Sequence, residues 1–225
     1  MLWRYNRFNM DVYTNQKRYF EEAYQSGEHG WPTTGPTPFV KSFLQSFLKE
    51  RPVGNILDLG CGEGRHTLLF AGNSYFAVGM DLESKALLKA KKFARDKKFQ
   101  KKPHFILGNA LALPFKEGSF DILIDYGCLH HILKRDFSLY LRDTLSLLKP
   151  KGYFLLTCFS IRFKHQPNER RSRDWIIHKG HYDRFFRKSD FAKLFGKNYR
   201  ILKVEEEKDP EKPHYVFNNV LMQKR

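Results

Sequence analysis

The segment Ile56 to Thr67 (ILDLGCGEGRHT) contains the residues whose spacing points most directly to chemistry. An apolar run leads into glycines at positions 60, 62 and 64, and residues that favour a helix follow. Glycines spaced in this way allow a sharp turn and a close approach of a ligand to the backbone. The next apolar run ends at Asp81, from which a carboxylate can accept both hydroxyls of a ribose. The two features predict a site for a nucleoside-bearing ligand.

The glycine spacing separates two classes of nucleoside-binding loop. A dinucleotide-binding loop would carry its third glycine at position 65, but Arg65 stands there and the third glycine is Gly64. The GxGxG spacing, with Asp58 two residues before it, resembles the first motif of class I S-adenosylmethionine (SAM) dependent methyltransferases. Three later stretches follow in that family's order: GNALALPF, SFDILIDYGCLHHI and LLKPKGYFLLT. The resemblance covers residues 36 to 160.

The resemblance implies that the chain binds SAM and releases S-adenosylhomocysteine. Asp58 would favour the ammonium group of SAM, and Asp81 would hold its ribose. The residues that would pass beside the methionine part are Gly60, Cys61, Gly62 and Gly64.

The adenine end of the cofactor is implied in the same way. Leu82 would lie against the ring. Asn109 stands where the family usually has Asp, and its carbonyl still offers an acceptor for the adenine amino group. Ala110 and Leu111 would add a backbone N–H and an apolar wall, and Tyr126 would begin the loop that faces the sulfonium.

The stretch YFEEAYQSGEHGWP, residues 19–32, is similar to the region before the first motif in thiopurine- and tellurite-type small-molecule methyltransferases. In those proteins an aromatic residue helps to close over the cofactor. We therefore expect Trp31 near SAM. The alternative is that Trp31 packs the N-terminal arm, residues 1–36, onto the body of the protein.

His130 and His131 follow the fourth predicted strand, at the edge where sheets of this kind place their ligand crevice. Together with Tyr126 they are the candidate catalytic residues, and His131 is favoured as a general base. The alternative is that a histidine here begins a helix and bonds to the backbone. Methyl transfer from a sulfonium can also depend on positioning alone, without a dedicated base.

Apolar runs and helical segments alternate from Asn55 onward, which indicates a mostly parallel sheet with helices on both faces. The resemblance implies a Rossmann-like α/β fold with seven strands and an antiparallel C-terminal strand. Residues 199–207 and 215–223 are separated by a short turn, so they can be neighbours only as an antiparallel hairpin.

Two helices can be bounded by their sequence. Thr37 and Pro38 predict the start of a helix that reaches residue 50. A second helix is expected over residues 138–148, with Ser138 as its cap. Its buried face is predicted to contain Leu141, Leu145 and Leu148.

Residues 161–190 lie where this family inserts substrate-binding elements, and we name them the cover. The cover carries nine Lys or Arg, four acids and several aromatic residues. It could grip an anionic or aromatic substrate or stack on nucleic-acid bases. Alternatively, it could be a solvated cover whose aromatic side chains belong to the core.

The composition bounds the remaining possibilities. Forty Lys and Arg against twenty-four Asp and Glu give a net charge of +16, so an acidic partner or substrate is expected. Residues 84–102 alone carry nine Lys or Arg and one acid, either as a solvated helix face or as a footprint for RNA. No apolar run is long enough for a membrane span. The three cysteines, Cys61, Cys128 and Cys158, are far apart and form no CxxC pair, which argues against disulfides and against a metal site. We therefore expect a reducing, cytoplasmic setting.

The sequence therefore predicts one domain over residues 1–225, a SAM-dependent methyltransferase that acts on a small, anionic or aromatic acceptor. A methyltransferase directed at RNA or protein is the second hypothesis, because of the charge. A SAM-binding or nucleic-acid-binding module without catalysis and an NAD oxidoreductase are the remaining alternatives. The oligomeric state is left open.

Overall fold

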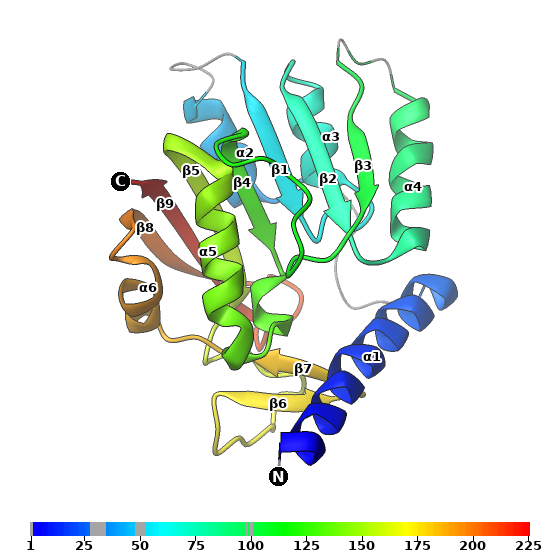
Figure 1. The fold of residues 1–225 in the computed structure, drawn as a ribbon, viewed down its shortest axis with the longest axis vertical. Coiled ribbons are helices and arrows are strands. Elements are labelled where there is room, and N and C mark those ends of the chain that lie inside the picture. Colours follow the sequence, from blue (N-terminus) through cyan, green and yellow to red (C-terminus); the bar gives the residue numbers. More distant parts are fainter. Residues whose placement is uncertain (1, 28–34, 48–52, 98, 100) are drawn as a thin grey trace.

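The computed structural model describes residues 2–27, 35–47, 53–97, 99 and 101–225, and side chains from residue 12 onward. A seven-stranded sheet forms its centre, with strand order β3-β2-β1-β4-β5-β9-β8 (Figure 1). The strands are β1 (Asn55–Leu59), β2 (Phe76–Asp81), β3 (His104–Leu107), β4 (Phe120–Tyr126), β5 (Leu148–Phe159), β8 (Tyr199–Lys208) and β9 (Val216–Lys224). Strand β9 lies between β5 and β8 and is antiparallel to both, which confirms the predicted sheet and its C-terminal hairpin.

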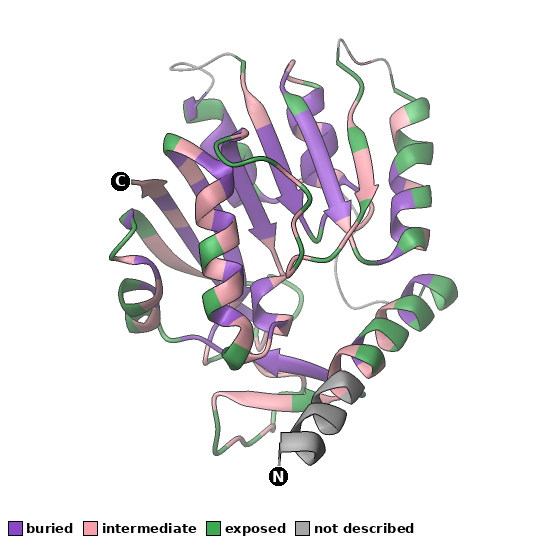
Figure 2. Ribbon diagram, viewed as in Figure 1, coloured by how far each residue is buried: buried purple, intermediate pink, exposed green. Residues whose placement is uncertain are grey.

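Helices cover both faces of the sheet because neighbouring residues of each buried strand point to opposite sides. On β4, Leu123 packs into the core beneath α5 (Phe137–Leu147) and α6 (Lys188–Phe195). Ile122 and Ile124 pack on the other side, against α2 (Pro38–Phe47) and α3 (Arg65–Ala71). Figure 2 shows that β1, β2 and β4 are buried along most of their length, while exposed residues lie on the outer surface of the helices.

The predicted start of α2 at Pro38 is confirmed, and the described part of this helix ends at Phe47. The predicted cap of α5 was wrong, but the predicted leucines do pack against the core: Leu148 is buried, and Leu141 and Leu145 are partly buried. The helix begins at Phe137 after Asp136, and its buried residues are Phe137, Tyr140, Thr144 and Leu147. The larger aromatic side chains face the sheet, where the Tyr140 hydroxyl donates a hydrogen bond to Asp125.

Three further elements lie at the carboxyl end of the parallel strands. Helix α1 (Leu2–Ser26) and the antiparallel pair β6 (Trp175–His178) and β7 (His181–Arg184) pack against each other there (Figure 1). Lys179 and Gly180 join the pair with φ values of 48° and 83°, the left-handed backbone that a two-residue hairpin turn requires. Helix α4 (Ser84–Arg95) and the short turns η1 (Leu129–His131) and η2 (Lys134–Asp136) complete the described elements. None of the described helices is long and apolar enough to span a membrane.

Candidate active site

A cavity of about 490 Å³ lies at the carboxyl ends of β1, β2 and β4, where ligand crevices of parallel sheets are found. Residues predicted from the sequence to contact the cofactor form one wall: Asp58, Gly60, Cys61, Gly62, Asp81, Leu82, Asn109, Ala110, Leu111 and Tyr126. The candidate catalytic residues His130 and His131 line the same cavity. Gly64 does not line it, and Trp31 lies outside the described residues.

The Asp81 carboxylate is held by the backbone on both sides. The amide of Gly62 donates to its Oδ2 at 2.8 Å, and the amide of Glu83 donates to its Oδ1 at 2.8 Å. Burial raises the pKa of Asp81 to about 6, although these two amides oppose the shift. The remaining lone pairs of a carboxylate fixed in this way can accept the two hydroxyls of a ribose.

Two glycines of the loop have different structural roles. A Cβ on Gly62, whose φ is 55°, would lie 2.8 Å from the hydroxyl of Tyr24 inside the cavity. A Cβ on Gly64, whose φ is 81°, would lie 2.7 Å from the ring of Phe105. Gly62 therefore keeps space open for a ligand, whereas Gly64 permits the loop to pack against β3.

Asp58 is an almost fully buried carboxylate, with 1% of its surface exposed. Its Oδ2 accepts hydrogen bonds from the Thr67 amide at 3.1 Å and the Thr67 hydroxyl at 2.7 Å. Burial raises the pKa of Asp58 to about 7 despite these bonds. A buried carboxylate of this kind is stabilised in its ionised form by a cation, and the ammonium group of SAM would supply one.

The turn after β3 and the end of β4 form two further parts of the cavity wall. The Asn109 amide oxygen accepts a hydrogen bond from the Leu111 amide at 2.9 Å, which leaves one lone pair for an adenine amino group. The guanidinium of Arg65 lies 4.7 Å from the centre of the Tyr126 ring. Tyr126 is thereby fixed between the glycine loop and the open part of the cavity.

The two candidate histidines have different environments. The Phe159 amide donates to Nδ1 of His130 at 3.3 Å, and the two rings stack with centroids 3.7 Å apart. Burial lowers the pKa of His130 well below its usual value, so the ring is neutral and carries its proton on Nε2. His131 instead turns its Nδ1 toward Asp183, at 3.0 Å from Oδ1.

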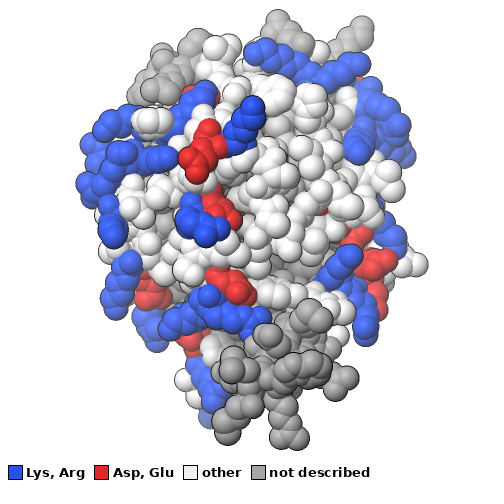
Figure 3. Space-filling model, viewed as in Figure 1, with Lys and Arg blue, Asp and Glu red and all other residues white. Residues whose placement is uncertain are grey.

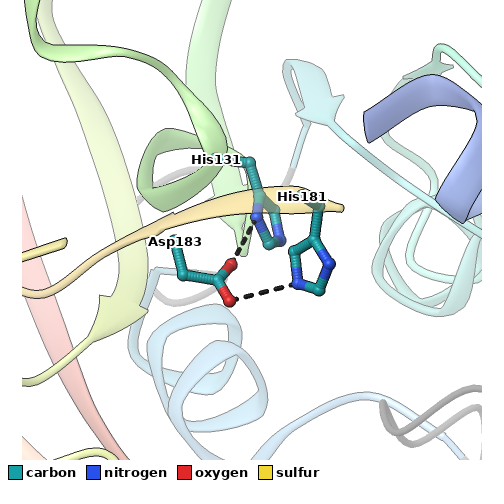
Figure 4. Close-up of side chains that lie close together, drawn as sticks. All are labelled: His131, His181 and Asp183. Carbon is teal, nitrogen blue, oxygen red and sulfur yellow. Dashed lines mark ion pairs between the residues drawn. The ribbon is translucent and has the colours of Figure 1, made fainter. Parts of the chain in front are cut away.

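Asp183 is the centre of a cluster of histidines that sequence reasoning did not predict. It is fully buried, and its Oδ2 lies 2.9 Å from Nε2 of His165 and 3.1 Å from Nε2 of His181. Figure 4 shows His131, His181 and Asp183 converging from η1 and β7. Burial would raise the pKa of Asp183, but the three imidazoles lower it well below its usual value, so it is ionised. The alternation His181-x-Asp183 was the available signal, because it places both side chains on one face of a strand.

Helix α1 forms a further wall of the cavity, and its Tyr24 approaches Gly62 of the glycine loop. The Tyr13 hydroxyl donates to Asp136 at 2.7 Å and accepts from the Leu133 amide at 3.1 Å. Gln16 donates to the backbone oxygen of His131 at 3.0 Å. The α1 residues that line the cavity are Tyr13, Gln16, Tyr19, Phe20 and Tyr24. Their spacing of three or four residues was the signal in the sequence for a helix with one face on the site.

The residues of the cover divide between the cavity and the core. His165, His178, Lys179 and His181 line the cavity. Most of the aromatic residues belong to the core instead: Tyr182, Phe185 and Phe186 are buried away from the cavity. Arg171 lies over the Phe185 ring at 3.4 Å and pairs with Glu169 at 2.9 Å, so it stabilises the cover itself.

The basic residues of α4 divide into two groups. Lys85 donates to Gln25 of α1 at 2.9 Å, and Lys89 donates to Glu63 of the glycine loop at 3.0 Å. The exposed ones are Lys91, Lys92 and Arg95, with Lys97 just beyond the helix. Figure 3 shows Lys and Arg side chains along the edge of the molecule where α4 lies.

Comparisons with known proteins agree with this geometry. Residues 51–207 match the family model of a methyltransferase domain. The chain belongs to the class I SAM-dependent methyltransferases. An uncharacterized methyltransferase of Schizosaccharomyces pombe is 30% identical to this methyltransferase over 142 residues, 62% of this chain and 91% of the relative.

Two other relatives of this methyltransferase have named acceptors of different kinds. A solved structure of a Burkholderia thailandensis 1,6-didemethyltoxoflavin-N1-methyltransferase, with 1,6-didemethyltoxoflavin and S-adenosylhomocysteine bound, shares its fold with a TM-score of 0.75. The identity is 21%, over 94% of this chain and 88% of that chain. A tRNA (carboxymethyluridine(34)-5-O)-methyltransferase of Xenopus tropicalis is 25% identical over 69% of this chain, which spans 23% of that protein.

Proposed function

We propose that this methyltransferase acts on a small acceptor that binds between the sulfonium of SAM and the wall formed by α1 and the cover. Asp58, the glycine loop, Asp81, Leu82 and residues 109–111 hold the cofactor in this proposal, and Tyr126 separates it from the acceptor. The cofactor walls suit SAM because they offer a buried carboxylate for an ammonium and a fixed carboxylate for a ribose.

The observation that carries this proposal is the way α1 closes over the cavity. The ring of Tyr19 stacks on His181 with centroids 4.0 Å apart, and Gln16 bonds to the backbone of His131. These contacts join α1 to β7 and to η1, the turn that carries the candidate catalytic histidines. The space beneath them suits a small aromatic or anionic molecule, since aromatic rings, imidazoles and Lys179 line it.

His131 is the side chain that we propose acts on the acceptor. His130 is less suited to accept a proton, because its Nδ1 already accepts a hydrogen bond from the backbone. In the transfer itself the acceptor atom forms a bond to the methyl carbon while the carbon–sulfur bond breaks, and the electron pair stays on sulfur. Tyr126 contributes by shaping the space between the acceptor and the methyl group of SAM.

The whole chain serves as one domain in this proposal, with α1 and the cover added to the sheet that binds SAM. Cys61, Cys128 and Cys158 are unpaired, which is consistent with a reducing compartment such as the cytoplasm. The exposed lysines and arginines of α4 are the feature that favours RNA as a second candidate acceptor.

Labelled SAM distinguishes the two acceptor classes. The protein is incubated with labelled SAM in three separate reactions. One contains a set of anionic and aromatic metabolites, one contains total RNA, and one contains total protein. We expect the label in small molecules. Label found only in RNA or only in protein would contradict the proposal.

A further inference from the structure

We propose that the acceptor side of the cavity binds one divalent first-row transition-metal ion through Nδ1 of His131, Nε2 of His181 and both carboxylate oxygens of Asp183. The three residues can each offer a ligand atom such that the three atoms lie within 4.8 Å of one another (Figure 4). The three side chains come from two elements at the carboxyl end of the sheet. His131 ends η1, and His181 and Asp183 are alternate residues of β7.

The distances between the ligand atoms fit a shared ion. His131 Nδ1 lies 3.0 Å from one oxygen of Asp183, and His181 Nε2 lies 3.1 Å from the other. Two ligands placed about 2.0–2.2 Å from a metal, at roughly right angles, are themselves about 3 Å apart. Two imidazoles and one carboxylate form a donor set that suits zinc, iron or manganese in the divalent state.

The environment of Asp183 also indicates a cation. Its side chain is completely buried, and among the described residues no lysine or arginine pairs with it. Among the described residues, the only polar groups that approach its oxygens are three imidazole nitrogens within 3.1 Å. A buried carboxylate needs partners for its lone pairs, and a metal ion shared with the imidazoles would supply one.

The surroundings would hold the ligands in place. Tyr19 stacks on the ring of His181, and His165 approaches Asp183 at 2.9 Å while its own ring stacks on His178. His165 is thus placed to support the carboxylate from outside the group of three ligands. Partners of this kind fix the orientation of metal ligands. His131 and His181 also line the cavity, so an ion bound by them would have its open positions toward the acceptor.

The role of the ion in catalysis rests on the proposed function, whereas its binding does not. An acceptor hydroxyl, thiol or similar group bound to the ion would lose its proton to water more readily. The ionised acceptor atom would then attack the methyl carbon of SAM, with the electron pair of the broken bond left on sulfur. His131 would act here as a ligand, in place of a general base.

The alternative use of the same residues is a hydrogen-bonded network without metal. Nδ1 of His131 also lies 3.1 Å from the backbone oxygen of Tyr182, to which a protonated Nδ1 could donate. A metal ligand must have its lone pair free, so the two arrangements exclude each other at this atom.

Cobalt binding tests the inference without any need for turnover. The chain is stripped of metal with a chelator and titrated with Co²⁺, and the ligand-field absorption in the visible range is recorded. We expect one bound Co²⁺ per chain, displaced by Zn²⁺. His131→Gln and His181→Ala should weaken binding at least tenfold, a loss of about 1.4 kcal/mol or more. His104→Ala, which removes an exposed imidazole on β3 that does not line the cavity, should leave binding unchanged.

The outcomes separate the metal site from the proposed function. Absence of Co²⁺ and Zn²⁺ binding by the folded wild-type chain would overturn the inference, and so would equal losses in His104→Ala and His181→Ala. S-adenosylhomocysteine binding checks that each variant retains its cofactor site. A bound ion in a chain that methylates no small molecule would support the metal site and count against the proposed function. Methyl transfer to a small molecule by a chain that binds no metal would support the proposed function and count against the metal site.

Discussion

The amide of Gly62 donates a hydrogen bond to the carboxylate of Asp81, joining the loop after β1 to the end of β2. This bond holds together the two segments that we propose contact the methionine part and the ribose of SAM. The Asp81 carboxylate therefore supports the glycine loop in addition to its proposed role as a partner of the ribose.

Asp81→Ala should weaken binding of S-adenosylhomocysteine by about 2–4 kcal/mol, or roughly thirty- to a thousandfold, because two charge-assisted hydrogen bonds to the ribose are lost. Titration calorimetry measures the change. Asp96→Ala, which removes an exposed carboxylate at the end of α4, is the matched control. Unchanged affinity in a folded Asp81→Ala protein would show that the cofactor site has been misplaced.

Gly64→Ala and Gly118→Ala separate backbone strain from packing. Both glycines have a positive φ, 81° and 62°, which costs an alanine about 1–2 kcal/mol. Of the two positions, only a Cβ at position 64 would meet a neighbour, the Phe105 ring at 2.7 Å. Gly64→Ala should therefore lower the free energy of unfolding by roughly a further 1–3 kcal/mol. Denaturant unfolding of the two variants measures the difference. Equal stabilities would mean that Phe105 moves aside without cost.

Affinity for S-adenosylhomocysteine should fall as the pH decreases from about 7.5 to 5. Asp58 has a pKa of about 7 and Asp81 a pKa of about 6 in the free protein, and the ligand favours both ionised forms. Binding at low pH must therefore release protons, at a cost of up to about tenfold per pH unit for each group. Asp58→Asn should flatten the profile near pH 7. A flat profile in the wild-type protein would contradict the assigned ammonium contact.

The same raised pKa values have the opposite effect on folding. The ordinary pKa of an aspartate carboxyl is 3.8, and that of Asp58 in the folded chain is about 7. Between these two pH values, Asp58 holds a proton in the folded chain that it releases in the unfolded chain. The contribution of Asp58 to stability without cofactor therefore decreases as the pH rises through this range. Thermal unfolding of the wild type and of Asp58→Asn across pH 4–8 checks the sign.

Charge reversal at Lys91, Lys92, Arg95 and Lys97 should leave methylation of a small acceptor unchanged, because these side chains point away from the site. If RNA binds here, its affinity should depend less on salt after the reversal. The slope of log affinity against log salt concentration should decrease in magnitude by about 0.7 to 0.9 for each lost phosphate contact. Lys89→Glu is a different case, since it repels Glu63 in the glycine loop and should weaken cofactor binding. Loss of turnover in the fourfold variant, with cofactor affinity intact, would favour RNA as the acceptor.

Tyr13→Phe should raise the KM for the acceptor about two- to tenfold, because α1 loses the hydroxyl that bonds to Asp136 and Leu133. Cofactor affinity should be unaffected. Tyr153→Phe, which does not line the cavity, is the control. A change in cofactor affinity instead of KM would place α1 over SAM.

The sheet and the cofactor wall were predictable because their signals are local. Apolar runs of β1, β2 and β4 are each followed by the residue that meets the ligand, and parallel strands bring those residues to one edge. The charged side of α4 faces outward, as predicted: Lys91, Lys92 and Arg95 are exposed, while Lys85 and Lys89 are half-buried and do not line the cavity. Nothing in the sequence shows that these two lysines meet Gln25 and Glu63, because the contacts depend on where α1 and the loop lie.

The Asp183 cluster could not be predicted for the same reason. It joins η1 to β7 through the packing of the cover, and no local pattern specifies that packing. The expectation of no metal site was based on cysteine spacing, and the cluster contains no cysteine. On α5, the predicted leucines pack against the core, and the pattern missed that Tyr140 shares this face, where it bonds to Asp125.

The position of β9 between β5 and β8 has a consequence for how the protein folds. Strands β1 to β5 can assemble early, but β5 pairs on its second side only with β9, which follows the cover and β8 in the chain. Until then Phe154, Leu155 and Leu156 belong to an open sheet edge, which is a template for pairing with another molecule. Folding intermediates of this protein should therefore aggregate through β5, and slow pairing of β9 would set how long that risk lasts.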